Sequence, residues 1–478
     1  MTPFRIAGIA VSSASVTLAP HAAAAHAFGA RYDLPLPLGI YLAAAGAAVA
    51  VSFIGIFLFL RRSASRSIGL DFVAPQWLAG PFRIGATVLG ITILFVVLAT
   101  GLFGPEDAAQ NFSTVFVWVI WWVGFLLLSA LVADLWIAVD PFRALFLIVA
   151  KLFGRDPEGS YLPLPRQAGW FAPTGILAIG WVELVSDWSE SPRSLAALVG
   201  LYAVVAISGG VLFGLEWFRT ADPLGRLFAA LSRMAPLVAA GPNALRLRPP
   251  GEGLIDPGPH KAAEVVLIAC LIGMVLFDGL SETPAWAATL DFVSESQVLR
   301  PALLWLRDNG VNLLKALRTV GLLGTVLLFL AFYWAIAWTM GRFAGRHRST
   351  AFFAAAMAGS LLPIAVAYQL SHYVSYLLLA GQLVGPTASD PFGSGWNLFG
   401  LRDATIDVGV VGAEQVWWIA VVALIGGHSL AVLVGHRRAL LLFGSAREAT
   451  RSQIPMLFAM VGLTVLSLWI LAQPLVSD

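Results

Sequence analysis

Four ionisable residues stand inside long apolar stretches of the sequence, where a membrane span would place them. They are Glu183, Asp278, His372 and His428. A charged side chain at mid-bilayer costs about 2.5–3.5 kcal/mol on insertion scales, so such residues are usually paired inside a bundle and functional. Helix rise puts Glu183 and Asp278 beyond the midpoints of their spans and His372 near the end of its own, all toward one membrane face. We expect both carboxylates to face the bundle interior or an outward-opening cavity.

The acidic residues that follow these carboxylates have two interpretations. Asp187 and Glu282 lie four residues after Glu183 and Asp278, on the same helix faces and one turn further out. Glu282 also stands before a Thr-Pro pair, where Thr283 fits a helix N-cap. The capping interpretation is favoured for that stretch, whereas Asp278 is open to a structural or a functional role. His428 lies near or below the midplane, where a lone histidine is typical of an interhelical hydrogen bond.

His26 is a candidate metal ligand near the N-terminus. Residues 1–25 resemble a secretory signal peptide, with Arg5, a modest apolar stretch and Ala-x-Ala sites that end at Ala25 and Ala27. Cleavage after Ala25 would make His26 the first residue, and its α-amine and imidazole would suit Cu(II) or Zn(II). Cleavage after Ala27 would remove His26, and an uncleaved anchor is a third alternative.

These residues together form a hypothetical metal site for copper or zinc. Its candidate ligands are His26, His372, Asp278 and Glu183, because imidazole and carboxylate groups bind both metals. An extended chain covers about 3.3 Å per residue, so the segment before the first span allows His26 to reach across the bundle toward His372. Thiolate clusters and intrachain disulfides are excluded, since Cys270 is the only cysteine.

The elements that must hold these residues are membrane helices. The chain has 478 residues, of which 59% are hydrophobic and 12% charged, whereas a soluble protein has about 25% charged residues. Many apolar stretches reach the ~20 residues that a span needs. We predict an all-α, polytopic membrane helix bundle of about ten spanning helices, with residues 26–478 as a single integral-membrane domain. The net charge of +2 indicates no nucleic-acid partner, so the lipid bilayer is the expected partner, with a membrane or periplasmic subunit as an alternative.

Basic residues orient the predicted bundle. Most of the 29 Lys and Arg residues fall in loops on one side of the spans, which is then the cytoplasmic side. Both mature termini lie outside in this orientation, and we expect a multi-pass protein of the bacterial inner membrane. The outer loops 281–315 and 382–413 are long and are expected to hold interfacial or re-entrant pieces. The predicted spans lie near residues 38–60, 84–104, 113–138, 169–186, 194–218, 262–280, 316–341, 351–381, 412–435 and 454–472.

The sequence contains a parallel internal repeat of helix pairs, in residues 113–192 and 194–284. Each copy holds an aspartate followed by proline, at Asp140 and at Asp222, and then an amphipathic stretch. Aspartate fits a helix N-cap and proline the first helical position. Repeats of this kind occur in transporters, but duplication also occurs without transport, so the repeat indicates a fold before a function.

The start of the mature chain resembles a known family. Residues 25–38 read AHAFGARYDLPLPL and residues 278–284 read DGLSETP. Both segments are similar to bacterial integral-membrane proteins named fenitrothion hydrolase, whose mature start reads A-H-(x)-G-x-R-x-D-L-P-(I/L)-P. The resemblance covers most of the chain and implies hydrolysis of an organophosphate (phosphotriester) at the membrane, with no catalytic residues to carry over. This sequence departs from the pattern in the spacing between His26 and Gly29.

Three classes of function remain open at this point. A metal ion with an open coordination position could activate water for phosphotriester hydrolysis. A permease or channel for a small solute or a metal ion is indicated by the repeat, the buried carboxylates, and Gly359 and Pro363 in the long eighth span. A membrane subunit that anchors a partner protein is the third class. The sequence has no Walker A loop, dinucleotide-binding fingerprint, G-x-S-x-G motif or H-E-x-x-H motif.

Overall fold

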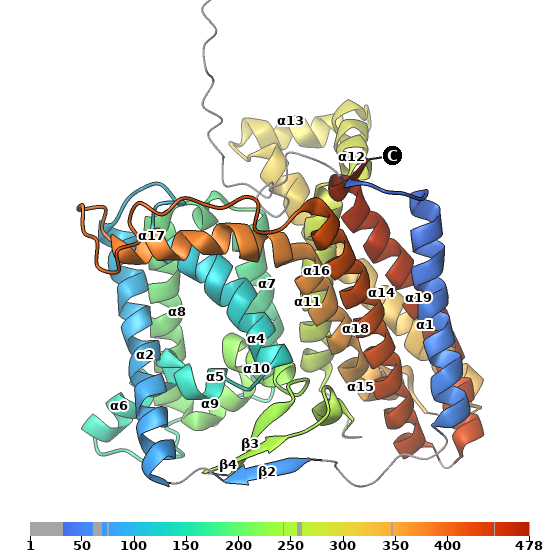
Figure 1. Ribbon diagram of the computed structural model, residues 1–478, viewed down its shortest axis with the longest axis horizontal. Coiled ribbons are helices and arrows are strands. Elements are labelled where there is room, and N and C mark those ends of the chain that lie inside the picture. The colour runs from blue at the N-terminus through green and yellow to red at the C-terminus, as the bar shows by residue number, and fades with distance from the viewer. Residues whose placement is uncertain are drawn as a thin grey trace, which may run out of the picture.

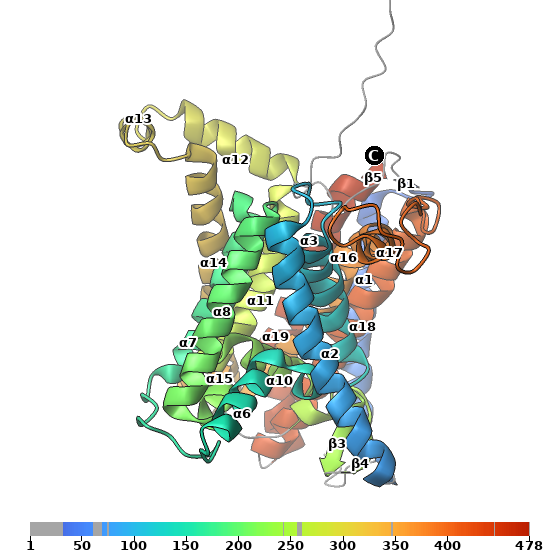
Figure 2. The same cartoon turned by 90° about the vertical axis from the view of Figure 1, so that its left-hand side faces the viewer.

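The computed structural model describes residues 32–60, 69–73, 76–241, 243–255, 261–345, 348–443 and 445–477. Nine helices in these ranges are long and apolar enough to cross a membrane. Figure 1 shows them side by side in one bundle, and Figure 2 shows the same bundle turned by 90°. This confirms the predicted all-α, multi-pass bundle. The predicted span at 169–186 is a shorter helix that also packs inside it.

The helices follow the predicted order along the chain. The long ones, with the short helices that continue them, are α1 (Leu38–Phe59), α2 (Gln76–Phe103), α3 (Phe112–Thr114), the π-helix η2 (Val115–Phe125), α4 (Leu126–Leu131), α8 (Pro192–Phe213), α11 (Ala262–Ser281), α14 (Leu313–Ala344), α15 (Thr350–Met357), α16 (Leu362–Ala380), α18 (Ala413–Leu442) and α19 (Ala446–Leu475). The shorter ones are α5 (Trp136–Val139), α6 (Pro141–Leu152), α7 (Phe171–Leu184), α9 (Leu215–Thr220), α10 (Pro223–Leu231), α12 (Pro284–Glu295), α13 (Arg300–Asp308) and α17 (Val384–Ser389). Five 3₁₀ turns connect them: η3 (Ala168–Trp170), η4 (Asp187–Ser189), η5 (Glu252–Leu254), η6 (Ala358–Leu361) and η7 (Gly381–Leu383).

Short strands mark the two ends of the bundle. β1 (Tyr32–Asp33) pairs in parallel with β5 (Val476–Ser477), so the two described ends of the chain meet at one end, the upper end in Figure 1. At the lower end, β2 (Leu70–Val73), β4 (Ala244–Leu247) and β3 (Leu237–Gly241) form an antiparallel sheet in the order β2-β4-β3. The described segments predicted to be cytoplasmic lie at the lower end, so the upper end is the predicted outer face.

The centre of the bundle is formed by α11 and by the segment from α15 to α17, which are the most buried of the long apolar segments. Between Glu264 and Asp278, α11 carries only apolar residues and glycine on all its sides, as expected of a helix surrounded by others. Glycine permits the close crossings: a Cβ on Gly273 of α11 would lie 2.8 Å from the Cα of Val326 in α14. A Cβ on Gly427 of α18 would lie 2.7 Å from the carbonyl oxygen of Pro363. Small residues at such crossings allow the close packing that holds membrane helices together.

The span that leads into α16 is interrupted. α15, η6 and α16 follow one another, with Pro363 in the first turn of α16, where its missing N–H costs nothing. The fully buried Arg438 of α18 donates to the carbonyl oxygen of Ala356 in the last turn of α15, and to that of Leu254 at 2.6 Å. A positive charge is favourable at the C-terminal end of a helix. Arg438 therefore stabilises the interruption between α15 and α16.

The repeated aspartates cap helices as predicted. Asp140 accepts hydrogen bonds from the backbone N–H groups of Phe142 and Arg143 at the start of α6. Asp222 accepts one from Gly225 at the start of α10, and another from the hydroxyl of Tyr202. Both copies of the repeat thus run from a long span through a short helix to an aspartate-capped helix. Superposition of residues 113–192 on 194–284 stays a prediction.

The two capping aspartates should make stability depend on pH. Burial raises the pKa of Asp140 to about 7, with the nearby Asp222 as the second cause, and burial raises the pKa of Asp222 to about 6. The native carboxyls bind protons more tightly than unfolded ones, so this stability is greatest at acid pH and falls as pH rises from about 4 to about 7. We expect Asp140→Asn, which keeps the cap, to raise the melting temperature by about 5 °C at about pH 8. Thermal unfolding in detergent measures this.

The gain from Asp140→Asn should shrink steadily toward about pH 3, where the wild-type carboxyl is mostly protonated in both states. Asp140→Ala is the matched control, because it removes the same charge and also removes the cap, at a cost of about 1 kcal/mol. A gain from Asp140→Asn that is equal at all pH values would contradict the assignment.

Candidate functional site

Asp278 lies in the last turn of α11, against α16. Its Oδ2 accepts hydrogen bonds from Nε2 of His372 at 2.8 Å and from the hydroxyl of Tyr373 at 2.5 Å. The exposed fraction of Asp278 is 4% and that of His372 is 1%. When Asp278 is ionised it can only accept hydrogen bonds, so Nε2 of His372 then carries the proton in this contact. The prediction that Asp278 faces the bundle interior is confirmed.

The approach of α16 to α11 creates this cluster. His372 and Tyr373 are neighbours on α16 and reach one carboxylate together because the two helices cross at this level. Gly279 leaves room for the crossing, since a Cβ there would lie 2.9 Å from the hydroxyl oxygen of Tyr368. The Tyr368 hydroxyl is buried and has no hydrogen-bond partner among the residues that the structure describes. Polar groups of three α16 residues therefore gather around one aspartate.

Glu183 provides a second carboxylate, from the last turn of α7. Its Oε2 accepts a hydrogen bond from Nε1 of Trp122 at 2.7 Å. Trp122 belongs to the π-helix η2, and π-helical turns are rare and frequently found at functional sites. Trp118, one turn earlier, donates from Nε1 to the carbonyl oxygen of Ser189 at 3.0 Å. The π-helix thus directs two indole N–H groups to α7 and the turn that follows it, and one of them holds Glu183.

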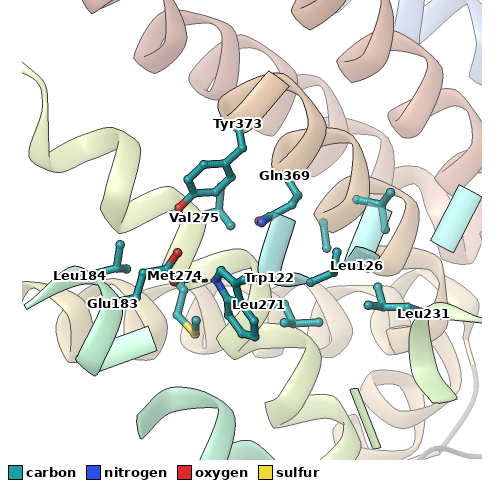
Figure 3. Close-up of a pocket in the computed structure, with 12 residues that line it drawn as sticks. Trp122, Leu126, Glu183, Leu184, Leu231, Leu271, Met274, Val275, Gln369 and Tyr373 are labelled. Atoms are coloured by element: carbon teal, nitrogen blue, oxygen red, sulfur yellow. Dashed lines mark hydrogen bonds between the residues drawn. The ribbon is translucent and has the colours of Figure 1, made fainter. Parts of the chain in front are cut away.

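A small cavity lies between the two carboxylate-bearing helices. Its volume is about 20 Å³, which is room for about one water molecule. Figure 3 shows the carboxyl group of Glu183 and the hydroxyl of Tyr373 pointing toward each other across it, with the amide of Gln369 nearby. Glu183 and Asp278 are also close enough to interact electrostatically. Tyr373 therefore stands between the two carboxylates and bonds directly to Asp278.

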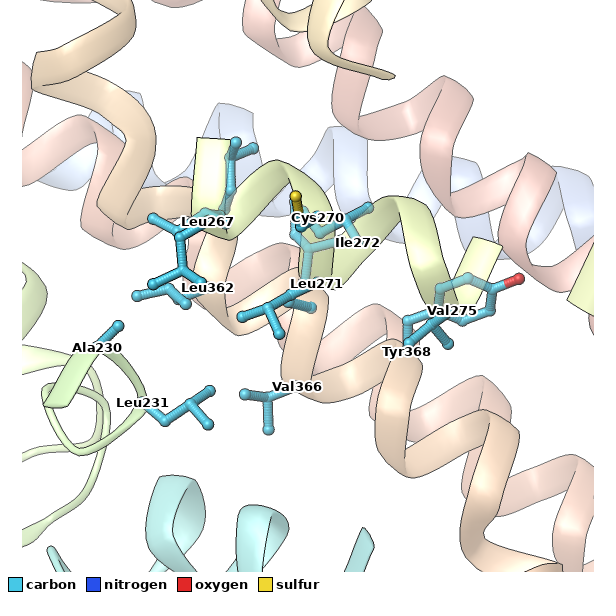
Figure 4. Packing of buried hydrophobic residues seen from close by; sticks show 14 of the residues in the cluster. Ala230, Leu231, Leu267, Cys270, Leu271, Ile272, Val275, Leu362, Val366 and Tyr368 are labelled. Carbon is cyan, nitrogen blue, oxygen red and sulfur yellow. The ribbon is translucent and has the colours of Figure 1, made fainter. Parts of the chain in front are cut away.

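The rest of the cavity wall is apolar. Leu271 of α11, Val366 of α16 and Leu231 of α10 line it and belong at the same time to the main core. Figure 4 shows these three side chains on the facing sides of their helices. Such surroundings give water little to bind, and they strengthen the electrostatic interactions of the polar groups at the cavity.

Each carboxylate has another acidic residue one turn nearer the upper end. Asp187 follows Glu183, forms an ion pair with Lys315, and lines a cleft of about 420 Å³ at the upper end. Glu282 follows Asp278, and burial together with the nearby Asp278 raises the pKa of Glu282. The predicted N-cap after Glu282 also forms, because the Thr283 hydroxyl accepts from the backbone at the start of α12. Acidic groups therefore lead from the upper end toward both buried carboxylates.

Of the four predicted metal ligands, the structure brings two into contact. Asp278 and His372 touch, while Glu183 lies across the cavity and binds Trp122. His26 lies outside the described residues. Within the described ranges, no group of three His, Cys, Asp or Glu side chains is placed to hold a metal ion. A copper or zinc site here therefore stays a prediction that needs a further ligand such as His26.

His428 does not join this cluster. It is buried in α18, and its Nδ1 contacts the carbonyl oxygen of Leu424 in the same helix at 2.8 Å. Its Nε2 has no hydrogen-bond partner among the described residues. The prediction of an interhelical hydrogen bond was wrong, because Nδ1 contacts the carbonyl group one turn back along its own helix.

Sequence reasoning missed the two aromatic residues that donate hydrogen bonds to the carboxylates, Tyr373 and Trp122. Both carry one polar group on a large apolar ring, and such residues usually find a hydrogen-bond partner when they are buried. That rule could have marked them as candidates. It could not have chosen their partners among many aromatic residues, since the partner depends on which helices cross.

The fold and the site define a class, a multi-pass α-helical membrane protein with a buried cluster of carboxylate, histidine and tyrosine groups. Comparisons with protein-family models, with curated proteins and with solved structures found no match.

Proposed function

We propose that this protein is a proton-linked permease, in which Asp278 and Glu183 bind and release protons. The observation that carries the proposal is the position of Asp278, buried between the two innermost segments and hydrogen-bonded by His372 and Tyr373. Chains of Asp, Glu and His inside the membrane act as proton relays in pumps and transporters. A purely structural polar contact would have no need of a second carboxylate facing the same tyrosine.

The cluster supports a simple proton transfer. Protonated Glu183 would give its proton to the hydroxyl oxygen of Tyr373, directly or through one water in the cavity, while the Tyr373 hydroxyl proton passes to Oδ2 of Asp278. The tyrosine is neutral before and after, and one proton has moved from one carboxyl to the other. The acidic residues one turn above, Asp187 and Glu282, would connect the two carboxyls to the upper face, and release to the lower face would follow a movement of the helices.

Protonation also supplies a reason for movement. Neutral Asp278 accepts more weakly from His372 and Tyr373 than the carboxylate does, because hydrogen bonds to a charged group are about twice as strong. The contact between α11 and α16 therefore loses free energy when the proton arrives. The interruption before Pro363 gives α16 a place to hinge relative to α15. A proton that binds more tightly to one conformation of the helices than to the other shifts the populations of the two conformations.

Liposomes with an internal pH dye test the proposal. Purified protein is reconstituted, a potassium diffusion potential is imposed, and small solutes are added by class: amino acids, sugars, organic cations and divalent metal ions. We expect one class at least to produce a protein-dependent change of internal pH. Folded, reconstituted protein that moves no protons with any class under either sign of the potential would overturn the proposal.

A metal-dependent phosphotriester hydrolase is the second candidate function. The specific observation in its favour is the contact of Asp278 with His372, two of the predicted ligands, in the last turn of α11 just before α12. With His26 as a further ligand they would hold copper or zinc, and the metal would supply a Lewis acid and an activated water. The resemblance to proteins named fenitrothion hydrolase gives the substrate class.

Elemental analysis and N-terminal sequencing of purified protein test this second candidate. If it is correct, the wild type carries about one equivalent of metal, His372→Ala loses it, and the wild type turns over a chromogenic phosphotriester. A mature chain that starts at Phe28, or a metal content unchanged by His372→Ala, would leave the resemblance as its sole support.

A further inference from the structure

We propose that α12 and α13 form an amphipathic hairpin that lies on the lipid headgroup layer at the upper end of the bundle. This inference does not depend on the proposed function. Neither helix contains a buried residue. Figure 2 shows both helices projecting sideways from the bundle, with α13 farther out than the upper end of α14. Trp286 at the start of α12 packs on Phe277 of α11. Phe292, Leu304 and Trp305 stay exposed, so something other than the bundle must cover them.

The length of α14 fixes the height of the hairpin. α14 has 32 residues, and residues 320–340 contain no charged side chain. This apolar part spans about 30 Å, which matches the hydrocarbon thickness of a bilayer. Lys315 and Arg318 stand just above it, and the helix rises about 10 Å from residue 320 to its first residue, Leu313. α13 ends a few residues before that point, so it lies at the level of the lipid headgroups.

The lateral position of α13 puts lipid beneath it. α14 exposes large apolar side chains along its length, among them Val320, Leu327 and Leu328, so one of its sides faces the acyl chains. α13 continues outward from the upper end of this lipid-facing helix. The layer next to its lower side is therefore the headgroup layer and not the top of the bundle.

The side chains of the hairpin suit that layer. Phe292, Val298 and Trp305 are 73%, 86% and 64% exposed, and Arg300 and Arg307 stand among them. Aromatic rings favour the interface, and arginine reaches the phosphates while its stem covers apolar surface. Residues 284–318 hold four basic and three acidic side chains, a nearly neutral balance. Apolar contact rather than attraction to anionic lipid should therefore hold the hairpin in place.

A single labelled cysteine tests the position. Cys270 is the only native cysteine and is buried in α11, so Cys270→Ala gives a background for Val298→Cys. An environment-sensitive fluorophore at position 298 is examined in phosphatidylcholine vesicles with spin-labelled headgroups. The matched control is Val408→Cys, 73% exposed in the loop between α17 and α18. We expect quenching at 298 to be at least about threefold that at 408, with and without added phosphatidylglycerol.

An aqueous quencher gives the opposite readout and completes the test. Iodide should quench the label at 408 strongly and the label at 298 weakly. Both valines are exposed, so neither substitution removes core packing, and an unchanged melting temperature checks this. Equal quenching at the two positions, or a label at 298 that iodide reaches freely, would overturn the proposal and leave a protein partner as the occupant. Quenching at 298 that requires phosphatidylglycerol would also overturn it.

Discussion

Asp278→Asn is expected to lower protein-dependent proton flux by about 100-fold while the bundle stays folded. Asparagine has nearly the shape of aspartate and still offers an oxygen to His372 and Tyr373, so the contact between α11 and α16 keeps its acceptor. It cannot take up a proton at physiological pH. Initial rates of internal pH change in liposomes under a fixed potassium diffusion potential measure the effect.

Related substitutions separate loss of the proton site from loss of structure. Tyr373→Phe removes the hydroxyl between the two carboxylates and should lower the flux by about tenfold, since a water molecule can replace part of its role. Asp403→Asn is the matched control, because Asp403 is exposed at the upper end and pairs with Arg402. Its flux should equal that of the wild type. Wild-type flux in a folded Asp278→Asn protein would show that Asp278 is not a proton carrier.

Gly90→Ala is expected to destabilise the protein by about 3 kcal/mol or more. A Cβ at Gly90 of α2 would lie 1.9 Å from the carbonyl oxygen of Val139 and 2.9 Å from its carbonyl carbon. Both are backbone atoms, which cannot rotate aside as a side chain can. Val139 directly precedes Asp140, so the added methyl group would separate α2 from the start of α6. Thermal unfolding of purified protein, or the yield of folded protein, measures the loss.

The same helix offers a control for this steric effect. Gly85 lies five residues before Gly90 on α2, and a Cβ there would meet no atom within 4 Å. Gly85→Ala should therefore be neutral or slightly stabilising, because alanine favours helix over glycine by about 1 kcal/mol. Similar melting temperatures for the two variants would contradict the close contact between α2 and Val139.

The sequence predicts most of the long helices because lipid leaves the backbone little choice. Apolar segments of sufficient length must satisfy their own N–H and C=O groups, and a single segment does so as a helix. The caps at Asp140 and Thr283 were predictable for a similar local reason. The structure of the basic segment after the ninth predicted span was less predictable. α18 continues through this segment to Leu442, so His436 is buried and its Nε2 contacts the carbonyl oxygen of Leu60. Counting charges orients a span but does not show where its helix ends or which residues turn inward.

The candidate site was predictable only in part. Asp278 and His372 stand out because a buried ionisable group costs free energy and needs a partner. Their partnership with Tyr373 depends on the rotation of α16, since neighbouring residues point about 100° apart around a helix. The link from Glu183 to Trp122 depends on the π-helical turns of η2, for which the amino acids give no clear pattern. The position of His26 relative to this cluster stays a prediction.

The parallel pairing of β1 with β5 has a consequence for how the protein is made. α1 packs chiefly against α18 and α19, so the earliest span of the bundle has its neighbours at the far end of the chain. At about 5–20 residues per second, a ribosome needs tens of seconds to supply them. During that time α1 stands in lipid beside helices that are not its final partners. The bundle can close around α1 only after α18 and α19 have entered the membrane. A nascent chain halted before α18 would therefore leave the packing surface of α1 exposed, and membrane quality control could recognise that surface.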